Sequence, residues 1–579
     1  MYRYNLVFNL VLLFGVVNPV LADAGKITII PEPMKMNVGE GKFTITPKTA
    51  IVVTEDTRCI GQYLAELLAT ATGFALDVKQ ISPSQRDSSC VILLNVSAKN
   101  DLGPEGYDLK VTANRISANA PTPAGVFYAC QTIRQLLPVD IESKEKIQDI
   151  NWIIPQVEIE DKPRFPWRGL MLDPSRRFWN VEFIKRYIDL LALYKVNVLH
   201  LHLTDDQGWR VEIKKYPKLT TIGAKVAERH KEAAQPYPGA NGFYTQDDIR
   251  EIVRYAASRY VTVVPEIDLP GHSMAILASY PELSCSGKEG YYEVFPALES
   301  MRAIIIGHKD VSLCAGKEKT FEFLQDVLSE VIELFPSPYI HIGGDEQDAS
   351  SWETCPLCQA KIKSEGLEKQ DCEELQKLYA DSETGKRKYL LYRYFMRRLC
   401  DFLTSKGRRA VMWDDIAWHG QFPQGAIIQQ WHYKGSKDKT HNIKLSESPA
   451  VEAARAGNDV VCSSGQAFYF DFTHKNYPFR VTYRFEPVPK ELTDEQAKHI
   501  LGAMGCMWTD VRATLEKVDS QVFPRLLALS EVTWSPKEKR NLEDFIDRLE
   551  THYKRLDKLG VKYYSGGTQA EDANQPSTQ

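Results

Sequence analysis

The sequence lacks several features that mark large functional classes. Lysine and arginine number 71 against 76 aspartates and glutamates, a formal net charge of −5. Without a basic excess, we do not expect binding to nucleic acid or to an anionic membrane. After the first residues there is no second long apolar run, which excludes a polytopic membrane protein. There is also no phosphate-binding loop, dinucleotide-binding glycine pattern or GxSxG motif.

What is present is ordinary globular composition in a long chain. Hydrophobic residues make up 43% of the 579 residues and charged residues 25%. This composition supplies a large core and excludes disorder as the main state. The length predicts two or three domains.

The first 22 residues have the pattern of an export signal. Arg3 precedes a mostly apolar stretch, Leu6–Val17, and Val20-Leu21-Ala22 offers small residues around a cleavage point. The stretch is too short for a membrane-spanning helix, so we predict a signal peptide over residues 1–22 rather than an uncleaved anchor. The mature chain would begin near Asp23, be periplasmic or secreted, and have no integral membrane segment.

The 11 cysteines are an odd number, so at least one thiol is expected to be free. Cys285 and Cys314 bracket a loop and are the best candidates for a disulfide, which an exported protein can retain. Cys355-Pro-Leu-Cys358 is a CxxC pair with neither a second CxxC nor a histidine pair nearby. Because zinc needs four ligands, a local disulfide or two buried thiols is the favoured interpretation. We therefore expect no metal site and no cofactor.

The chain divides near residue 160. Residues 23–160 predict a small non-catalytic α/β domain, and the proline-rich linker Asp161–Trp167 opens the second region. That region, residues 161–564, ends in a helix, and the polar residues 565–579 predict a disordered tail. In the first domain the expected strands are Lys26–Ile30, Ala50–Val53 and Val91–Val96, and the expected helices Ile60–Thr72 and Ala124–Leu137.

Short apolar runs alternate with helical patterns throughout the second region. Such alternation is typical of a parallel sheet covered by helices, and eight runs favour a (β/α)₈ TIM barrel over an open sheet. Expected helices include Val181–Lys195, Gln246–Arg259, Phe321–Phe335, Tyr392–Lys406 and Pro449–Ala456. The expected strands are Gly169–Asp173, Val196–Leu203, Val261–Asp268, Tyr339–Glu346, Arg409–Ile416, Ala426–His432, Asp459–Ser464 and Ile500–Trp508.

Carboxylates or tryptophans follow seven of these eight strands at their carboxyl ends. A barrel gathers these ends on one face, where barrel active sites lie. Indole rings cover the apolar face of a sugar and carboxylates bind its hydroxyls, so the set indicates a glycosidase. Glycoside hydrolysis usually requires two carboxylates on opposite sides of the bond. Asp345 and Glu346 are adjacent instead, so a 2-acetamido group of the substrate is a candidate nucleophile.

At these residues the sequence resembles glycoside hydrolase family 20, the β-N-acetylhexosaminidases. The first domain, with Ala124–Gln131, is similar to the family's non-catalytic N-terminal domain. The catalytic signature is His341-Ile-Gly-Gly-Asp-Glu346. The other matching motifs occur in order: Arg168–Asp173, His200–Arg210, Pro265–His272, Trp413–Asp415, Tyr469–Asp471, Phe485–Pro489 and Trp508.

The resemblance implies an exo-acting, retaining and substrate-assisted enzyme that removes terminal GlcNAc or GalNAc through an oxazolinium intermediate. Glu346 would be the general acid, Asp345 would hold the acetamide N–H, and Tyr469 would bind the acetamide oxygen. Asp206 and His272 would orient the acid pair from behind. The implied substrate-binding residues are Arg168, Trp413, Trp431, Asp471, Trp508 and Asp510.

The sequence departs from the family pattern at some positions, and two rival functions stand beside the one that the resemblance implies. Asp510 stands where glutamate is common, which bears on sugar selectivity, and Arg177 stands where histidine is frequent. One rival is an inactive exported carbohydrate-binding homologue, against which the acid pair and Tyr469 argue. The other is a metal-dependent sugar deacetylase that would use His202, Asp205 and His272. The oligomeric state and the natural glycan do not follow from the sequence.

Overall fold

A computed structural model describes most of the chain. The described residues are 26–81, 90–97, 102–298, 310–348, 350–369, 383–419, 422–438, 443–445 and 447–566. The predicted signal peptide, residues 1–22, and nearly all of the predicted tail lie outside them. Among the described helices, none combines the length and the apolar character needed to cross a membrane.

The first domain is a seven-stranded mixed sheet, and α1 (Arg58–Thr72) and α2 (Pro123–Leu136) share its hydrophobic core. The predicted strands β2 and β4 and the helices α1 and α2 are present, but Lys26–Ile30 is an irregular segment rather than a strand. The sequence pattern missed strands such as β5 and β6, whose buried residues alternate with polar, partly exposed ones. The strands are β1 (Lys35–Thr44), β2 (Ala50–Val53), β3 (Val78–Gln80), β4 (Val91–Val96), β5 (Tyr107–Val111), β6 (Arg115–Ala120) and β7 (Ile153–Asp161).

The second region closes into a barrel of eight parallel strands, as predicted. The observed strands end earlier than predicted, because the residues at their carboxyl ends belong to loops that form the mouth. β13 is the extreme case, with only Tyr339–His341 in strand conformation. The strands in barrel order are β8 (Trp167–Leu172), β9 (Val198–His202), β12 (Thr262–Glu266), β13, β14 (Arg409–Trp413), β15 (Ile427–Gln430), β18 (Asp459–Cys462) and β19 (Ile500–Met507).

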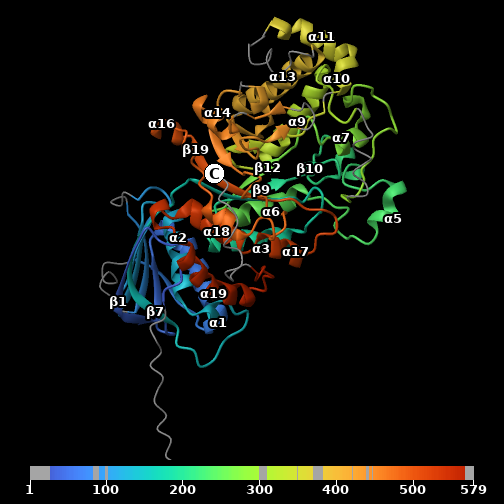
Figure 1. The fold of residues 1–579 in the computed structure, drawn as a ribbon. Helices are drawn as coiled ribbons and strands as arrows, with labels where there is room; N and C mark the ends of the chain where they lie inside the picture. Colours follow the sequence, from blue (N-terminus) through green and yellow to red (C-terminus); the bar gives the residue numbers. More distant parts are fainter. Residues whose placement is uncertain are drawn as a thin grey trace, which may run out of the picture.

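Helices cover the outside of the barrel (Figure 1). At the start of α6 (Gln246–Ala257), Thr245 and Asp248 exchange the hydrogen bonds of a capping box. The longer helices are α1 (Arg58–Thr72), α2 (Pro123–Leu136), α3 (Val181–Leu193), α6 (Gln246–Ala257), α9 (Glu318–Leu334), α11 (Pro356–Ser364), α13 (Glu383–Ser405), α17 (Leu515–Val522), α18 (Arg525–Trp534) and α19 (Leu542–Lys558). The shorter ones are α4 (Lys218–Thr221), α5 (Lys231–Ala234), α7 (Met274–Ser279), α10 (Ser350–Thr354), α14 (Pro449–Arg455), α15 (Phe479–Arg484) and α16 (Asp494–Ala497).

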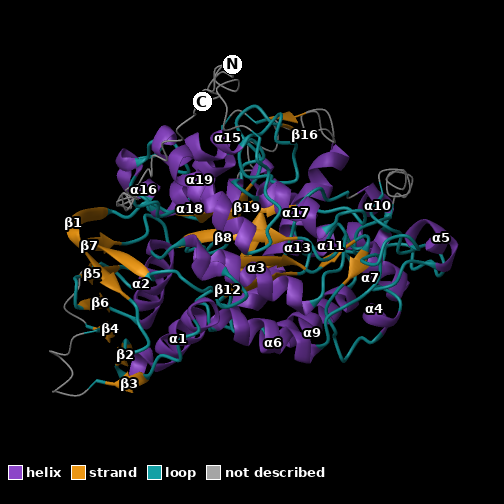
Figure 2. Cartoon of the chain, turned by 90° about the horizontal axis from the view of Figure 1, so that it is seen from below, coloured by secondary structure: helices purple, strands orange, loops and turns teal. Residues whose placement is uncertain are grey.

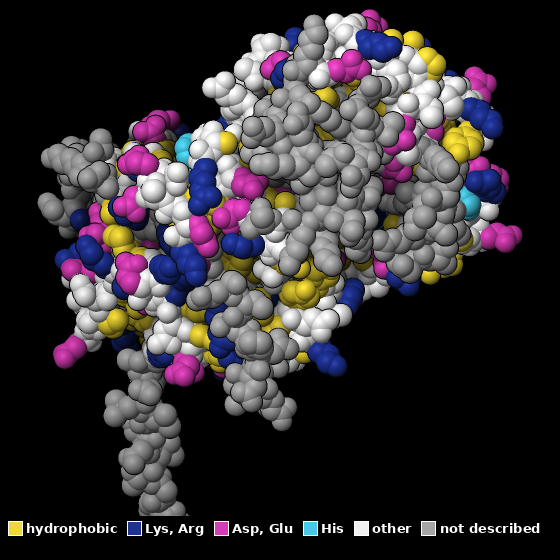
Figure 3. Space-filling view, turned by 45° about the horizontal axis from the view of Figure 1, so that its top comes forward, with side chains coloured by type: hydrophobic (Ala, Val, Ile, Leu, Met, Phe, Trp, Pro, Cys, Tyr) yellow, Lys and Arg dark blue, Asp and Glu magenta, His cyan; other side chains and the backbone are white. Residues whose placement is uncertain are grey.

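The two domains pack through α1 and α2, which lie between the sheet and the barrel (Figure 2). Aromatic rings meet across this contact: Phe127 lies 5.0 Å from Tyr260, and Tyr128 5.3 Å from Trp534, between ring centroids. A buried ion pair joins Lys195 to Asp161 at 2.9 Å. Acidic and basic side chains are interspersed over the face of the molecule in Figure 3.

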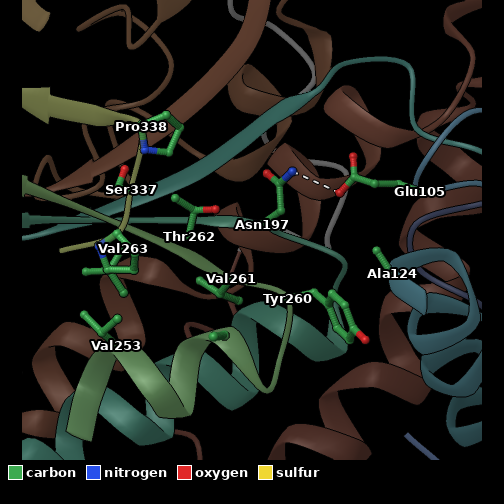
Figure 4. A pocket seen from close by; sticks show the side chains of 12 residues that line it. Glu105, Ala124, Asn197, Val253, Tyr260, Val261, Thr262, Val263, Ser337 and Pro338 are labelled. Atoms are coloured by element: carbon green, nitrogen blue, oxygen red, sulfur yellow. Dashed lines mark hydrogen bonds between the residues drawn. The ribbon is translucent and has the colours of Figure 1, made fainter. Parts of the chain in front are cut away.

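A pocket of about 310 Å³ opens beside this domain contact (Figure 4). Asn197, Thr262 and Pro338 line it, and each lies at the amino-terminal end of a barrel strand or just before it. Asn197 donates from Nδ2 to Glu105 of the first domain at 3.1 Å. The pocket is therefore on the side of the barrel opposite to the predicted catalytic residues.

The predicted disulfide between Cys285 and Cys314 is wrong. All ten cysteines in the described part of the chain are free thiols. The sulfur atoms of Cys285 and Cys314 lie in a group with those of Cys355 and Cys358, rather than as a bonded pair.

Candidate active site

The predicted acidic and aromatic residues meet at the carboxyl-terminal mouth of the barrel. His272, after β12, places Nε2 3.7 Å from Oδ2 of Asp345, which follows β13. Trp413 at the end of β14 lies 5.7 Å from Trp508 after β19, measured between ring centroids. Side chains from distant parts of the sequence thus share one site, as strand ends in a closed parallel barrel require.

The loop Gly343–Glu346 sets the directions of the two adjacent carboxylates. Gly343 and Gly344 have φ angles of 63° and 105°. At Gly343 a Cβ would lie 1.7 Å from Oδ1 of Asp268, so only glycine fits. Glu346 also has a left-handed φ of 44°, an uncommon conformation that is found at functional sites. Its backbone N–H donates to Oδ1 of Asp415 at 3.1 Å, which holds this turn.

The two carboxylates of the pair have different surroundings. The Asp345 side chain is 13% exposed, whereas that of Glu346 is 65% exposed. Oδ1 of Asp345 is buried and accepts no hydrogen bond from any described residue. Burial raises the pKa of Asp345, the proximity of His272 opposes this, and Glu266 and Glu346 raise it further. Asp345 is therefore a buried acceptor that a ligand N–H can satisfy.

His272 links the acid pair to a group of carboxylates behind it. Its Nδ1 lies 3.2 Å from Asp205 and 3.4 Å from Asp206, and its Nε2 lies 3.8 Å from Glu346. Burial disfavours its charge, but Asp205 and Asp345 outweigh this and hold the pKa of His272 well above its usual value. A positive imidazolium next to Asp345 favours the ionised form of that carboxylate. These contacts place His272 beside the acid pair and Asp206 beside His272, and the orienting role of both residues stays a prediction.

Glu266 forms the floor of the site. It is fully buried, and it accepts from Nε1 of Trp413 at 2.8 Å while His200 and His341 lie 3.0 Å away. Burial opposes ionisation, yet the neighbouring histidines keep the pKa of Glu266 well below its usual value. An ionised Glu266 therefore fixes the indole of Trp413 in the barrel.

An aromatic wall stands beside the acid pair. The rings of Trp431 and Tyr469 are nearly parallel, at 23° and 6.2 Å, and Tyr469 is 6.3 Å from Trp508. Nε1 of Trp431 donates to Oδ2 of Asp415 at 2.8 Å, so one aspartate positions both Trp431 and the turn at Glu346. Burial, followed by the proximity of Cys506 and Asp345, raises the pKa of Tyr469 well above its usual value. Its phenol therefore keeps its proton at neutral pH and can donate a hydrogen bond.

Two further aspartates predicted to bind sugar hydroxyls differ in availability. Oδ1 of Asp471 is buried and has no hydrogen-bond partner in the described structure. Asp510 instead pairs with Arg512, whose Nη2 donates to it at 2.7 Å, and its side chain is 42% exposed. Asp471 is thus open to a ligand, whereas Asp510 already has a partner.

The prediction that Arg168 grips sugar hydroxyls is wrong, because Arg168 lies at the other end of the barrel. It stands near the start of β8, is completely buried, and donates to Glu105 of the first domain at 2.8 Å. Arg176, eight residues later, occupies the mouth. It pairs with Asp173 at 3.1 Å and with Asp205, and its guanidinium lies 4.7 Å from the centre of the Trp508 ring.

Exchanging each arginine for lysine separates the two positions. We expect Arg176→Lys to lower kcat/KM about 10²-fold, because lysine lacks the planar fork that holds several partners in fixed geometry. Arg168→Lys should change kcat/KM little and lower the unfolding temperature by about 5 °C, since it weakens a buried ion pair. Kinetics and thermal unfolding of both variants provide the measurement, and the reverse pattern would reinstate Arg168 as the ligand.

Asp471 should make stability depend on pH. Burial raises its pKa from 3.8 to about 7, so the folded protein resists an ionisation that the unfolded chain undergoes readily. A raised carboxyl pKa costs no stability below about pH 4, costs progressively more up to pH 7, and stays costly above it. Asp471→Asn should therefore raise the unfolding temperature at pH 8 by about 3 °C and leave it unchanged at pH 4. Asp494→Asn on the exposed helix α16 is the control, and an equal gain at both pH values would disprove the explanation.

Several groups at the mouth combine histidine and carboxylate ligand atoms within reach of one another. One of them, Asp205 with Asp206 and His272, includes two of the residues considered for a deacetylase metal. Arg176 already pairs with Asp205, and His202 lies 3.0 Å from the same carboxylate. A guanidinium against the ligand oxygen repels a metal cation, so the geometry favours ion pairs here.

Sequence reasoning missed Arg176, Glu266 and Asp415 as site residues. All three fall inside or directly after motifs at strand ends, so the signal was present. Asp415 shows why the sequence alone did not single out these residues. Its role depends on hydrogen bonds with the Trp431 indole and with the backbone of Glu346, and only the folded chain brings these groups together. Burial raises the pKa of Asp415 to about 7.

Two family models match the chain. The model described as glycosyl hydrolase family 20, catalytic domain, matches residues 165–537, and the model for domain 2 of the same family matches residues 26–162. The β-hexosaminidase of Porphyromonas gingivalis is 36% identical over 551 residues, which cover 93% of this chain and 64% of that protein. The chain thus spans less than two thirds of that relative's length.

Solved structures are similar over nearly the whole chain. The family 20 β-N-acetylhexosaminidase of Streptomyces coelicolor A3(2) is 33% identical with a TM-score of 0.74, covering 93% of this chain and 97% of that one. A mutant Streptomyces plicatus β-hexosaminidase, solved with its product GlcNAc, is 31% identical with a TM-score of 0.75, covering 94% and 97%.

Proposed function

Because this chain belongs to glycoside hydrolase family 20, we propose that it is an exo-acting β-N-acetylhexosaminidase that releases terminal β-linked GlcNAc. The observation that supports this most directly is the unsatisfied buried Oδ1 of Asp345 beside an aromatic wall. Such an acceptor needs a hydrogen-bond donor, and the N–H of the 2-acetamido group of GlcNAc supplies one. The rings around it cover the methyl group and the apolar sugar face.

We propose that the acetamide carbonyl oxygen is the nucleophile. As it attacks C1, the glycosidic C–O bond breaks, and Glu346 gives its proton to the leaving oxygen. The product of this step is a cyclic oxazolinium ion, with the sugar still in the site. Glu346 then takes a proton from water, whose oxygen attacks C1 and reopens the ring with retention.

Asp345 and Tyr469 act on the acetamide itself. The Asp345 carboxylate accepts from the acetamide N–H and stabilises the positive charge that develops on the ring. The protonated phenol of Tyr469 donates to the acetamide oxygen and aims it at C1. His272 supports the charge of Asp345, since its Nε2 lies 3.7 Å away.

GalNAc is included in the proposed substrate range. It differs from GlcNAc only at C4, and Asp510, a candidate ligand for that region, is paired with Arg512. A carboxylate that is already paired makes a weaker distinction between the two C4 configurations.

The test is an assay of the full chain on matched aryl β-glycosides of GlcNAc, GalNAc and glucose. The two N-acetyl sugars should be hydrolysed and the glucoside should be nearly inert, since its 2-hydroxyl cannot form the ring. A thiazoline analogue of the intermediate should inhibit strongly, as mimics of unstable intermediates do. Rapid turnover of the glucoside without thiazoline inhibition would refute the mechanism. Hydrolysis of the aryl N-acetylglycosides that persists in excess chelator would exclude the metal-dependent deacetylase alternative.

We further propose that the enzyme is exported to the periplasm or secreted. The support is the pattern of residues 1–22, which precede the described structure. Expression of the full gene followed by amino-terminal sequencing should give a mature protein starting near Asp23. Recovery of the intact amino terminus only from the cytosol would contradict export.

A further inference from the structure

Four cysteines from separate parts of the chain meet near the active-site mouth. They are Cys285, Cys314, Cys355 and Cys358, and all their sulfur atoms lie within 4.8 Å of one another. Cys314 and Cys358 are completely buried, Cys355 is 6% exposed, and Cys285 is partly buried. Free cysteine is common in protein cores as a small hydrophobic residue, so the feature to explain is the gathering of four sulfur atoms within 4.8 Å of one another.

The spacing of the sulfur atoms is that of a tetrahedral metal site. Sγ of Cys358 lies 3.6 Å from that of Cys314 and 3.8 Å from that of Cys285, and Cys314 is 3.9 Å from Cys355. Four sulfurs placed about 2.3 Å from a central Zn²⁺ are about 3.8 Å apart. A disulfide would need about 2.05 Å.

The segments that bear the cysteines are held together by close backbone contacts. Cys355 caps α11 and Cys358 lies in its first turn, so the CxxC pair presents both sulfurs from one helix end. Opposite them, a Cβ at Gly316 would lie 2.3 Å from the backbone carbon of Leu357, so only glycine allows this approach. The backbone N–H of Cys314 donates to the carbonyl of Leu283 at 2.8 Å, which ties the two remaining ligands together.

We propose that Cys285, Cys314, Cys355 and Cys358 bind one structural zinc ion. The four thiolates complete the coordination shell, which leaves no open position for water or substrate and makes the ion structural. Tetrahedral sulfur coordination also suits iron, but a closed shell of four cysteines is typical of structural zinc sites. The expectation from the sequence that this CxxC pair stands without metal is thereby revised.

The zinc would brace the loop that follows the catalytic pair. Between Glu346 and Cys355, three contacts join this loop to the segment around Cys314. The Ser312 hydroxyl donates to the carbonyl of Asp348 at 2.7 Å, Nε2 of Gln347 donates to that hydroxyl at 3.3 Å, and Nε1 of Trp352 donates to the carbonyl of Leu313 at 3.0 Å. Because Cys314 and Cys355 would both bind the zinc, the metal would hold the loop and the segment around Cys314 together next to these contacts.

The first test measures metal and thiols in the wild-type full chain, purified without chelator. We expect about one zinc per chain by inductively coupled plasma mass spectrometry. After unfolding in chelator without reductant, alkylation and peptide mapping should find all four cysteines as free thiols. Replacing the zinc by Co²⁺ should give the visible absorption bands of a tetrahedral cobalt thiolate. None of these readouts requires glycosidase activity, so they stand apart from the proposed function.

The second test uses matched cysteine variants. Cys358→Ala should lose the metal and lower the unfolding temperature by at least about 5 °C. Cys400→Ala removes another buried thiol, on α13 outside the group, and should keep the zinc. If Cys358→Ala does not fold, the wild-type measurement still decides.

Three results would overturn the proposal. The first is wild-type protein that contains almost no metal and takes up neither zinc nor cobalt after reduction. The second is a disulfide within the group of four. The third is iron in place of zinc at the same stoichiometry, which would refute the choice of metal.

Discussion

Asp345→Asn is expected to lower kcat/KM on the order of 10³-fold, and by a similar factor for good and poor leaving groups. The substitution keeps the size of the side chain but removes its negative charge. That charge stabilises the oxazolinium ion, which forms whatever the leaving group is. Steady-state kinetics on an activated aryl GlcNAc glycoside and on a GlcNAc disaccharide give the two factors.

The matched control is Asp348→Asn, three residues further along the same loop. Its Oδ1 accepts from the backbone N–H of Ser350, away from the acid pair. We expect its kcat/KM to stay within about threefold of wild type, because the same change of charge now occurs outside the site. Equal losses in both variants would show that loop charge, rather than the Asp345 carboxylate, matters.

Glu346→Gln should give the second large effect, with a different dependence on the leaving group. Glutamine cannot donate a proton to the glycosidic oxygen, so substrates with poor leaving groups should slow about 10² to 10⁴-fold. Activated aryl glycosides need little protonation and should lose much less. The measurement is kcat/KM across aryl glycosides of graded leaving-group pKa, compared with the disaccharide.

The backbone around Glu346 provides an internal check on this variant. Asp415 accepts from the backbone N–H of Glu346, a bond that Glu346→Gln leaves intact. An unchanged unfolding temperature would show that the turn is preserved. If kcat/KM then falls equally for all leaving groups, Glu346 is not the general acid.

The site was predictable where its chemistry follows the strands. Asp345, Glu346 and the three tryptophans lie at or near strand ends, and a barrel places all such ends on one face. Tyr469 lies in the loop after β18, and only the family resemblance pointed to it. Their assignment needed only the order of strands and a family resemblance. The individual roles remain predictions that the variants above address.

Arg168 and Arg176 show what the motifs at strand ends could not predict. Arg168 opens the motif Arg168–Asp173, and Arg176 follows that motif by three residues. Residue 168 is near the amino end of β8 and residue 176 lies beyond its carboxyl end, so a strand of six residues puts them on opposite sides of the barrel. Motif membership alone does not say which end of the strand a side chain serves.

The sequence by itself determined the barrel, its eight strands and the adjacent acid pair, because apolar periodicity and local motifs are properties of neighbouring residues. Only the tertiary structure decided which arginine reaches the mouth, and that four cysteines form one group. Cys285 and Cys358 are 73 residues apart, yet their sulfurs lie 3.8 Å from each other. Such a distance results from how two loops pack against each other through Gly316 and Leu357, and no local pattern of residues encodes it.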